Sequence, residues 1–211
     1  MTTDLIADIS AAYGVPCYRC LTGFKWIADI INHKPEEQFL VGGEESYGYL
    51  IGDAVRDKDA VASAVMIAEM AANAKAQGRT VLQQLEAIHR EFGQYQERLI
   101  SITKKGRSGA QEIADMMTAL RNDPPKTLAG SPVVIAIDHN NSTQTDLRTG
   151  ATSSTALPAS NVLQCITEAG DKVSARPSGT EPKIKFYFSV RATTGGSHAA
   201  TKAELERKID T

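Results

Sequence analysis

The period of the apolar residues changes near residue 96, and this change limits the folds available to the chain. Before it, short apolar runs alternate with amphipathic helical segments, of which 57–77 is the clearest. After it, short strand-like runs follow one another, and in 184–190 every second side chain is apolar. The pattern predicts an α/β part followed by an α+β part, whose mainly antiparallel sheet is covered by two helices.

Local signals predict particular elements in the first part. Helical spacing of apolar residues predicts helices at 4–12 and 24–31, and a brief strand is expected between them at 15–21. The segment 42–48 has too many glycines for a regular strand, so we expect a loop there. Thr80 and Gln83 have the spacing of a helix capping box.

The second part contains two further capping-box spacings and one long polar segment. Ser108 with Gln111, and Thr201 with Glu204, predict helix starts. The segment 139–158 is rich in Ser, Thr and Asn, which predicts a long exposed loop with a hairpin around Asp146.

Composition excludes several classes of protein. The 211 residues include 23 Lys plus Arg and 25 Asp plus Glu, and a net charge of −2 disfavours nucleic acid or an anionic membrane as partner. The acidic opening MTTDLIADIS is unlike a signal peptide, and no apolar stretch is long enough to span a bilayer, so we expect a cytoplasmic protein. Cys17, Cys20 and Cys165 are expected as reduced thiols, and the C-x-x-C pair lacks further ligands for a metal.

A basic cluster interrupts this near-neutral chain. Residues 172–191 hold five basic side chains and one carboxylate, a net charge of +4, around the segment RPSGTEP at 176–182. An arginine fork, two hydroxyls and a glycine that exposes backbone N–H groups suit a phosphate, and two prolines stiffen the loop. An ordinary surface turn with basic neighbours is the alternative.

A second loop, GEESYG at 43–48, carries neighbouring carboxylates. On an extended backbone Glu44 and Ser46 face one side and Glu45 the other, and a carboxylate with a hydroxyl suits a polyol such as a sugar. From the residues alone, a solvated turn is equally compatible.

Together these segments resemble the α-D-phosphohexomutase family, particularly its phosphoglucomutase and phosphomannomutase members. The resemblance is carried by TGFKW at 22–26, by GEESYG with RDKD at 56–59, and by RPSGTEP followed by KIKFY at 183–187. It implies that residues 1–96 are the C-terminal part of the sugar-binding α/β/α domain 3. Residues 97–211 would then be the smaller phosphate-binding domain 4.

The resemblance also implies roles for individual residues. Glu44 and Ser46 would bind sugar hydroxyls, and Thr22 with Gly23 would make a backbone contact to the substrate. Lys58 would lie near the transferring phosphate as a proton donor or acceptor, which requires a lowered pKa. The implied phosphate-binding residues are Arg176, Ser178, Gly179, Thr180 and Lys185.

Two of the family's motifs are missing from this sequence. Neither a phosphoserine loop of the T-A-S-H-N-P type nor a Mg²⁺ loop of the D-G-D-x-D-R type occurs. The resemblance therefore implies that Mg²⁺ and the phosphoserine belong to N-terminal domains of the same protein, and that this chain binds no metal. Without those groups phosphoryl transfer loses its main electrostatic stabilisation, so we expect the chain alone to be inactive.

The expected activity is interconversion of a sugar 1-phosphate and 6-phosphate through a bisphosphorylated sugar, with this chain supplying sugar and phosphate recognition. The substrate is a hexose or pentose phosphate, and the sequence does not separate glucose from mannose or a pentose. The alternative is a stand-alone sugar-phosphate or anion-binding module without catalysis. A purely structural fragment would leave the basic cluster without a purpose.

Overall fold

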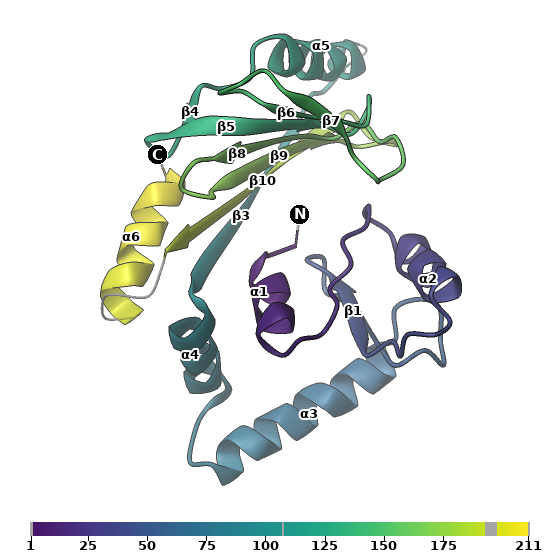
Figure 1. The fold of residues 1–211 in the computed structure, drawn as a ribbon, viewed down its shortest axis with the longest axis vertical. Coiled ribbons are helices and arrows are strands. Elements are labelled where there is room, and N and C mark those ends of the chain that lie inside the picture. The colour runs from purple at the N-terminus through teal and green to yellow at the C-terminus, as the bar shows by residue number, and fades with distance from the viewer. Residues whose placement is uncertain (1, 107, 193–197, 211) are drawn as a thin grey trace. The chain divides into compact units, whose positions relative to one another are not determined.

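The computed structural model describes residues 2–106, 108–192 and 198–210 (Figure 1). Within these residues the chain divides into two units, Thr2–Gly93 and Gln94–Thr211. The division lies three residues before the boundary that the family resemblance implies at residue 96. No helix among the described residues combines the length and apolar character needed to cross a bilayer.

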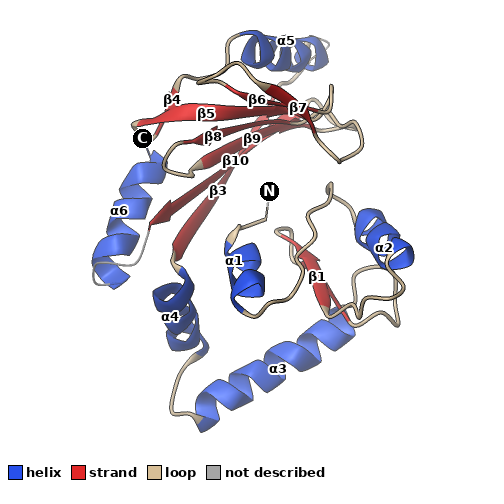
Figure 2. Ribbon diagram, in the orientation of Figure 1, coloured by secondary structure: helices blue, strands red, loops and turns tan. Residues whose placement is uncertain are grey.

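Helices dominate the first unit (Figure 2). Its elements are α1 (Leu5–Ala12), α2 (Phe24–His33), β1 (Val41–Glu44), β2 (Gly48–Ile51), α3 (Ala60–Ala76) and α4 (Val81–Phe92). The capping box at α4 is confirmed, because the Thr80 hydroxyl accepts the Gln83 N–H and the Gln83 side chain accepts the Thr80 N–H. Asp59 caps α3 by accepting two backbone N–H groups, so this helix begins at residue 60.

The glycines of 42–48 belong to a hairpin, and the prediction that they break the strand is wrong. Gly43 lies opposite Tyr49 and Glu44 opposite Gly48 in the antiparallel register of β1 and β2. A Cβ placed on Gly43 would lie 2.8 Å from a ring carbon of Tyr49. The ring lies so close that a side chain at position 43 would collide with it, so glycine at this position allows the strand pairing and does not end the strand.

The segment 15–21 is irregular, which corrects the prediction of a strand there. A strand needs a hydrogen-bonded neighbour, and none of the described strands pairs with this segment. Side chains fix it to the end of α2 instead. The Tyr18 hydroxyl donates to Glu37 at 2.6 Å, and the Lys34 ammonium lies 4.4 Å from the centre of the Tyr18 ring and 2.9 Å from Glu37.

The second unit is built on an antiparallel sheet. Its elements are β3 (Gln94–Thr103), α5 (Gly109–Asn122), β4 (Thr127–Leu128), β5 (Ser131–Asp138), β6 (Thr143–Asp146), β7 (Thr152–Ser154), β8 (Leu163–Thr167), β9 (Lys172–Pro177), β10 (Lys183–Ala192) and α6 (His198–Asp210). The strand order is β3-β10-β9-β8-β5-β6-β7, with β4 beside β5. This arrangement confirms the predicted fold class, an α/β part followed by an antiparallel sheet with helices. The hairpin of β6 and β7 confirms the turn expected near Asp146, but its strands extend the sheet beside β5, so the long exposed loop predicted at 139–158 is wrong.

Helix α5 covers one face of this sheet and forms its core. Ile113 and Met117 of α5 pack against Leu163, Ala175 and Ile184, from strands β8, β9 and β10. The side chain of Ile184 is completely buried. Since side chains alternate along a strand, the neighbours of these core residues point to the opposite face.

Helix α6 is fixed to the sheet by a buried ion pair. The Lys208 ammonium lies 2.6 Å from the carboxylate of Asp171, which is 2% exposed. The helix begins at residue 198, so Thr201 lies inside it and the cap predicted there is wrong. The helix start predicted at Ser108 is confirmed, because Ser108 is the N-cap residue of α5. The predicted capping hydrogen bond does not form, since the Ser108 hydroxyl donates to the Glu112 side chain and accepts no backbone N–H.

Burial separates the thiols in reactivity. Cys17 is exposed, whereas Cys165 lies in β8 at 2% exposure, and burial raises the pKa of its thiol from 9.0 to about 11. A raised pKa lowers the thiolate fraction at pH 8 by about two powers of ten. We expect iodoacetamide to label Cys17 in the native chain and leave Cys165 unmodified, as measured by peptide mass spectrometry. Equal labelling of both thiols in the folded chain would contradict this burial.

Candidate functional site

The β1–β2 hairpin positions the predicted sugar-binding pair. Glu44 is the last residue of β1, and Ser46 lies in the three-residue turn that follows. The Ser46 hydroxyl lies 3.5 Å from one carboxylate oxygen of Glu44, so the two side chains share one side of the hairpin. A polyol on this side would meet an acceptor carboxylate and a hydroxyl together.

The second oxygen of Glu44 joins the hairpin to the start of α2. It accepts the backbone N–H of Gly23 at 2.5 Å. Gly23 precedes α2 with φ +121°, a backbone conformation that favours glycine. The structure therefore brings Thr22, Gly23, Glu44 and Ser46 to one place, although twenty-one residues separate Gly23 from Glu44.

Tyr47 occupies an unfavourable backbone conformation in the same turn. Its φ is +65°, and its side chain is 89% exposed. In three-residue hairpin loops the left-handed position before the second strand favours glycine. The Tyr47 conformation costs free energy that its exposed ring does not recover through packing.

We expect Tyr47→Gly to raise the free energy of unfolding of the first unit by roughly 0.5–1 kcal/mol, because glycine adopts this φ without strain. Tyr47→Ala is the matched control, since it removes the same ring and retains the strain. Urea denaturation followed by fluorescence of Trp26, which belongs to this unit, measures both variants. A Tyr47→Gly chain that is less stable than Tyr47→Ala would show that this φ carries no cost.

Lys58 lies beside the hairpin. The backbone N–H of Asp59 donates to the Tyr49 carbonyl of β2 at 2.9 Å, which ties the 56–59 segment to this strand. The Lys58 ammonium is 2.9 Å from Asp57 and 4.7 Å from the centre of the Phe24 ring. Phe24 directly follows Gly23, so adjacent residues contact Glu44 and Lys58.

The electrostatics of Lys58 favour a fixed positive charge. The hydrogen bond from its ammonium to Asp57 raises the pKa of Lys58, and the charges of Asp57 and Glu44 add to the increase. The same hydrogen bond lowers the pKa of Asp57. A lysine with a raised pKa stays protonated at neutral pH, which suits attraction of a phosphate. The proton-transfer role implied by the resemblance needs the opposite shift and stays a prediction.

The predicted phosphate-binding residues lie on β9, β10 and the loop between them. Arg176 is directly opposite Lys185 in the antiparallel register. Because Ala175 and Ile184 face α5, Arg176 and Lys185 point to the other face of the sheet. Neither side chain donates a hydrogen bond or forms an ion pair to any residue that the structure describes. We call Arg176 and Lys185 the basic pair.

Hydrogen bonds fix the loop that joins these strands. The Ser178 hydroxyl oxygen accepts the N–H of Glu181 at 3.2 Å and that of Thr180 at 3.4 Å, while the Ser178 N–H donates to the Lys183 carbonyl at 2.7 Å. Ser178 therefore shapes the loop, and its own hydroxyl proton is left to donate to a ligand. A Cβ on Gly179 would meet nothing within 4 Å, so open space surrounds the loop at this residue.

A polar network lies on the same face of β9 as Arg176. The Gln164 amide donates to the Ser174 hydroxyl at 2.9 Å, and its oxygen lies 3.1 Å from Nε2 of His139. Ser174 is completely buried and His139 is 6% exposed. These contacts hold β9 two residues before the basic pair.

No group of three or more His, Cys, Asp or Glu side chains suited to a metal ion occurs in 2–106, 108–192 and 198–210. That this chain binds no metal stays a prediction, as does the location of the Mg²⁺ site in other domains.

Sequence reasoning did not assign Phe24, Gly48 or Asp57 to the site. Each contacts Lys58 or limits its position. The adjacency of Asp57 and Lys58 in RDKD is a signal for their ion pair. The contact of Lys58 with Phe24 joins residues thirty-four positions apart, and no local pattern reports it.

Comparison with known proteins finds similarity to one family. The family model of phosphoglucomutase/phosphomannomutase alpha/beta/alpha domain III matches residues 1–92. A phosphoglucomutase from Staphylococcus epidermidis is 38% identical over 187 residues, which cover 88% of this chain and 34% of that protein. A probable phosphomannomutase from Haemophilus influenzae is 38% identical over 210 residues, covering 99% of this chain and 39% of that protein.

A solved structure shows the same fold. The open form of the exocytosis-sensitive phosphoprotein pp63/parafusin from Paramecium, a phosphoglucomutase, aligns with a TM-score of 0.66 at 17% identity. It covers 99% of this chain, which covers 35% of that structure. The chain thus spans about a third of the length of the relatives it matches. The match to domain III and the similarity to these relatives support a place for the chain in the α-D-phosphohexomutase family.

Proposed function

We propose that this chain supplies sugar and phosphate recognition to a phosphohexomutase, which interconverts a sugar 1-phosphate and 6-phosphate through a bisphosphorylated sugar. The family is named for such reactions, and this chain spans about a third of its relatives. The phosphoserine and Mg²⁺ belong to the remaining domains. In isolation the chain binds ligand without turning it over.

The basic pair carries this proposal. Arg176 and Lys185 lie opposite each other on β9 and β10, next to the hydrogen-bonded loop that joins these strands. Neither side chain has a hydrogen-bond or ion-pair partner among the described residues. A guanidinium offers a planar fork that matches two phosphate oxygens, and the lysine adds a compact charge. Beside them, Ser178 and Thr180 supply hydroxyls, and Gly179 supplies its backbone N–H. This set holds the phosphate that does not react.

The hairpin supplies the sugar contacts in this proposal. Glu44 accepts hydrogen bonds from sugar hydroxyls, and Ser46 completes the pair. The hydrogen bond from Gly23 fixes the Glu44 carboxylate before the sugar arrives, which lowers the entropy lost on binding. Lys58 supplies positive charge for the second phosphate, the one that transfers.

In this proposal the motifs absent from this chain carry out phosphoryl transfer, and the chain itself recognises the substrate. When bound, Mg²⁺ neutralises charge on the transferring phosphoryl group. The residues of this chain bind and orient the sugar and its other phosphate, so that either end of the sugar can be presented to the phosphoserine. Such positioning contributes to the rate by replacing bimolecular encounter with a fixed geometry.

Reconstitution tests the proposal. The part of the Haemophilus influenzae relative that lies outside the match is produced separately and mixed with this chain. We expect interconversion of glucose or mannose 1-phosphate and 6-phosphate in the mixture and none from either piece alone. Pentose phosphates in the same assay identify the preferred sugar.

Formation of the complex is measured in the same mixture by analytical ultracentrifugation. A complex that forms and shows no interconversion would contradict the mutase contribution. Affinity of the lone chain for glucose 6-phosphate, undiminished in that inactive complex, would favour the alternative of an anion-binding module without catalysis.

A further inference from the structure

Lys58 is confined by two residues that have no assigned role. A Cβ placed on Gly48 would lie 2.8 Å from Cδ of Lys58, 2.9 Å from its Cγ and 2.9 Å from Cε2 of Phe24. Carbon atoms that are not bonded pack at about 3.5–4.0 Å, so any side chain at position 48 displaces one of these groups. Gly48 is absent from the positive-φ residues of the chain, which means that its backbone does not require glycine. Glycine is required at position 48 because a side chain there would occupy the space that Lys58 and Phe24 fill.

Phe24 cannot yield this space easily. Its ring is 3% exposed and packs with Ile27 and Leu50 in the core of the first unit. The aliphatic part of the Lys58 side chain therefore lies between Gly48, which has no side chain, and the face of the Phe24 ring, which packing holds in place. The Lys58 side chain is 56% exposed, so its ammonium reaches water while its stem is held.

The same residues connect Lys58 to Glu44. Gly23 donates its N–H to Glu44, and the next residue, Phe24, carries the ring under the Lys58 ammonium. Gly48 lies directly opposite Glu44 in the hairpin register. The N-cap and the first residue of α2, together with one pair of strand residues, therefore set the positions of both the sugar-binding carboxylate and the cation.

We propose that Phe24 and Gly48 are positioning residues that hold the Lys58 ammonium beside Glu44, where it meets a phosphate group of the bound sugar. We call Phe24 and Gly48 the lysine seat. The proposal rests on the proposed function, because a sugar phosphate is the ligand. A cation held in advance on a ring face loses less side-chain entropy when the phosphate binds.

Proton chemical shifts test the seat without any ligand. Protons above an aromatic face move upfield, so the ε-methylene signal of Lys58 should be displaced in selectively ¹³C-lysine-labelled chain and assigned with Lys58→Arg. Gly48→Ala and Phe24→Leu should both return it to the ordinary lysine position. Lys25, whose ammonium lies 4.9 Å from the Trp26 ring, is the internal reference that should not change.

Affinity tests the consequence. We expect Lys58→Ala to weaken binding of glucose 1,6-bisphosphate by roughly tenfold, measured by calorimetry, and Gly48→Ala to weaken it comparably. The double variant Gly48→Ala/Lys58→Ala should be no weaker than Lys58→Ala, because both changes remove one interaction. Ile27→Val, from the same core cluster, is the control for a general packing defect and should retain wild-type affinity.

Each other outcome overturns the proposal in a distinguishable way. An ordinary Lys58 signal in the wild-type chain would show that the seat does not exist. Additive losses in the double variant would show that Gly48 acts on binding without Lys58. A wild-type chain that shows the displaced signal and binds no sugar phosphate would refute the proposed function and, with it, the ligand role of the seat.

Discussion

Replacing Arg176 with alanine should weaken binding of glucose 6-phosphate by roughly ten- to a hundredfold, because hydrogen bonds to charged groups contribute about 1.5–3 kcal/mol. Arg176 has no hydrogen-bond or ion-pair partner among the described residues, so the change breaks no internal contact of this kind. Stability should therefore change little, and the loss should appear in the dissociation constant measured by calorimetry. In the reconstituted enzyme the same change should raise KM.

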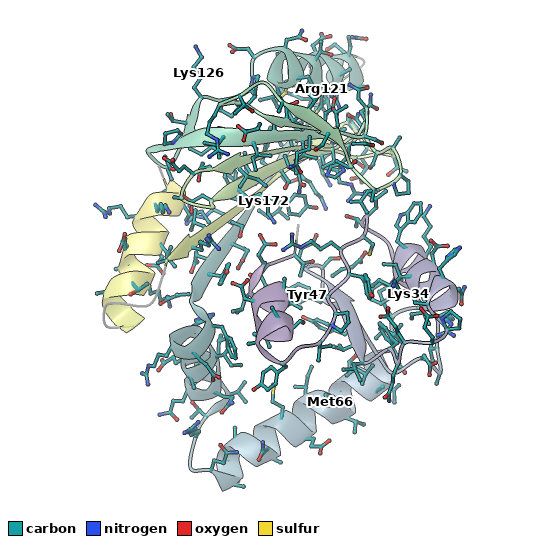
Figure 3. The ribbon with its side chains drawn as sticks, in the orientation of Figure 1. Lys34, Tyr47, Met66, Arg121, Lys126 and Lys172 are labelled. Carbon is teal, nitrogen blue, oxygen red and sulfur yellow. The ribbon has the colours of Figure 1, made fainter. Side chains whose placement is uncertain are left out.

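Two variants sharpen this test. Arg176→Lys keeps the charge and removes the planar fork, so its affinity should fall between those of the wild type and Arg176→Ala. Lys126→Ala removes one exposed positive charge from the same unit, and the Lys126 side chain points away from the sheet (Figure 3). This control should bind as the wild type does. Equal losses for Lys126→Ala and Arg176→Ala would mean that net charge alone attracts the ligand.

Replacing Ile184 with alanine should lower the free energy of unfolding of the second unit by about 2–5 kcal/mol, the range for large-to-small changes in a packed core. Ile184 is completely buried and packs in the α5 core cluster. It also neighbours Lys185, so a displaced β10 should disturb the basic pair. Hydrogen exchange of β10 amides reports this loss, because the single tryptophan lies in the other unit.

Leu99→Ala is the matched control for this loss. Leu99 belongs to the neighbouring strand β3, and it is 49% exposed. Less buried area is lost there and no closed cavity forms, so the destabilisation should be clearly smaller. Similar losses for Ile184→Ala and Leu99→Ala would contradict the position of the core on the α5 side of the sheet.

Local chemistry predicted the fold where a single segment contains the whole signal. The Thr80–Gln83 capping box is confirmed because both of its hydrogen bonds lie within four residues. The alternation in 184–190 predicted a strand with one buried face. The strand is confirmed as β10, but the single buried face is wrong, because Tyr187 and Ser189 are buried as well as Ile184 and Val190. The capping hydrogen bond predicted at Ser108 does not form because this residue has helical φ and ψ, so its side chain turns to Glu112.

Pairing between distant segments was harder to predict from the sequence. The composition of 15–21 suits a strand, yet a strand also needs a neighbour, which periodicity does not report. Val61 and Val65 lie on the apolar stripe of α3 and are 77% and 64% exposed. A stripe shows which residues are suited to burial and says nothing of what covers them.

The predictions about the site likewise divide into those that the local sequence supports and those that depend on tertiary packing. The side shared by Glu44 and Ser46 follows from strand alternation, which the sequence shows directly. The Gly23–Glu44 hydrogen bond and the position of Lys58 over Phe24 depend on tertiary packing, and no local sequence pattern predicts them. The direction of the Lys58 pKa likewise depended on its ion pair with Asp57.

A titration of the isolated chain with glucose 6-phosphate, followed by ¹H–¹⁵N correlation spectra, tests the central claim most directly. We predict the largest shift changes at the amides of Ser178, Gly179 and Thr180 and at the side-chain Nε of Arg176. Inorganic phosphate should reproduce these changes, and glucose without phosphate should not. Changes centred away from β9, β10 and their loop, or equal changes with glucose alone, would contradict phosphate recognition by the basic pair.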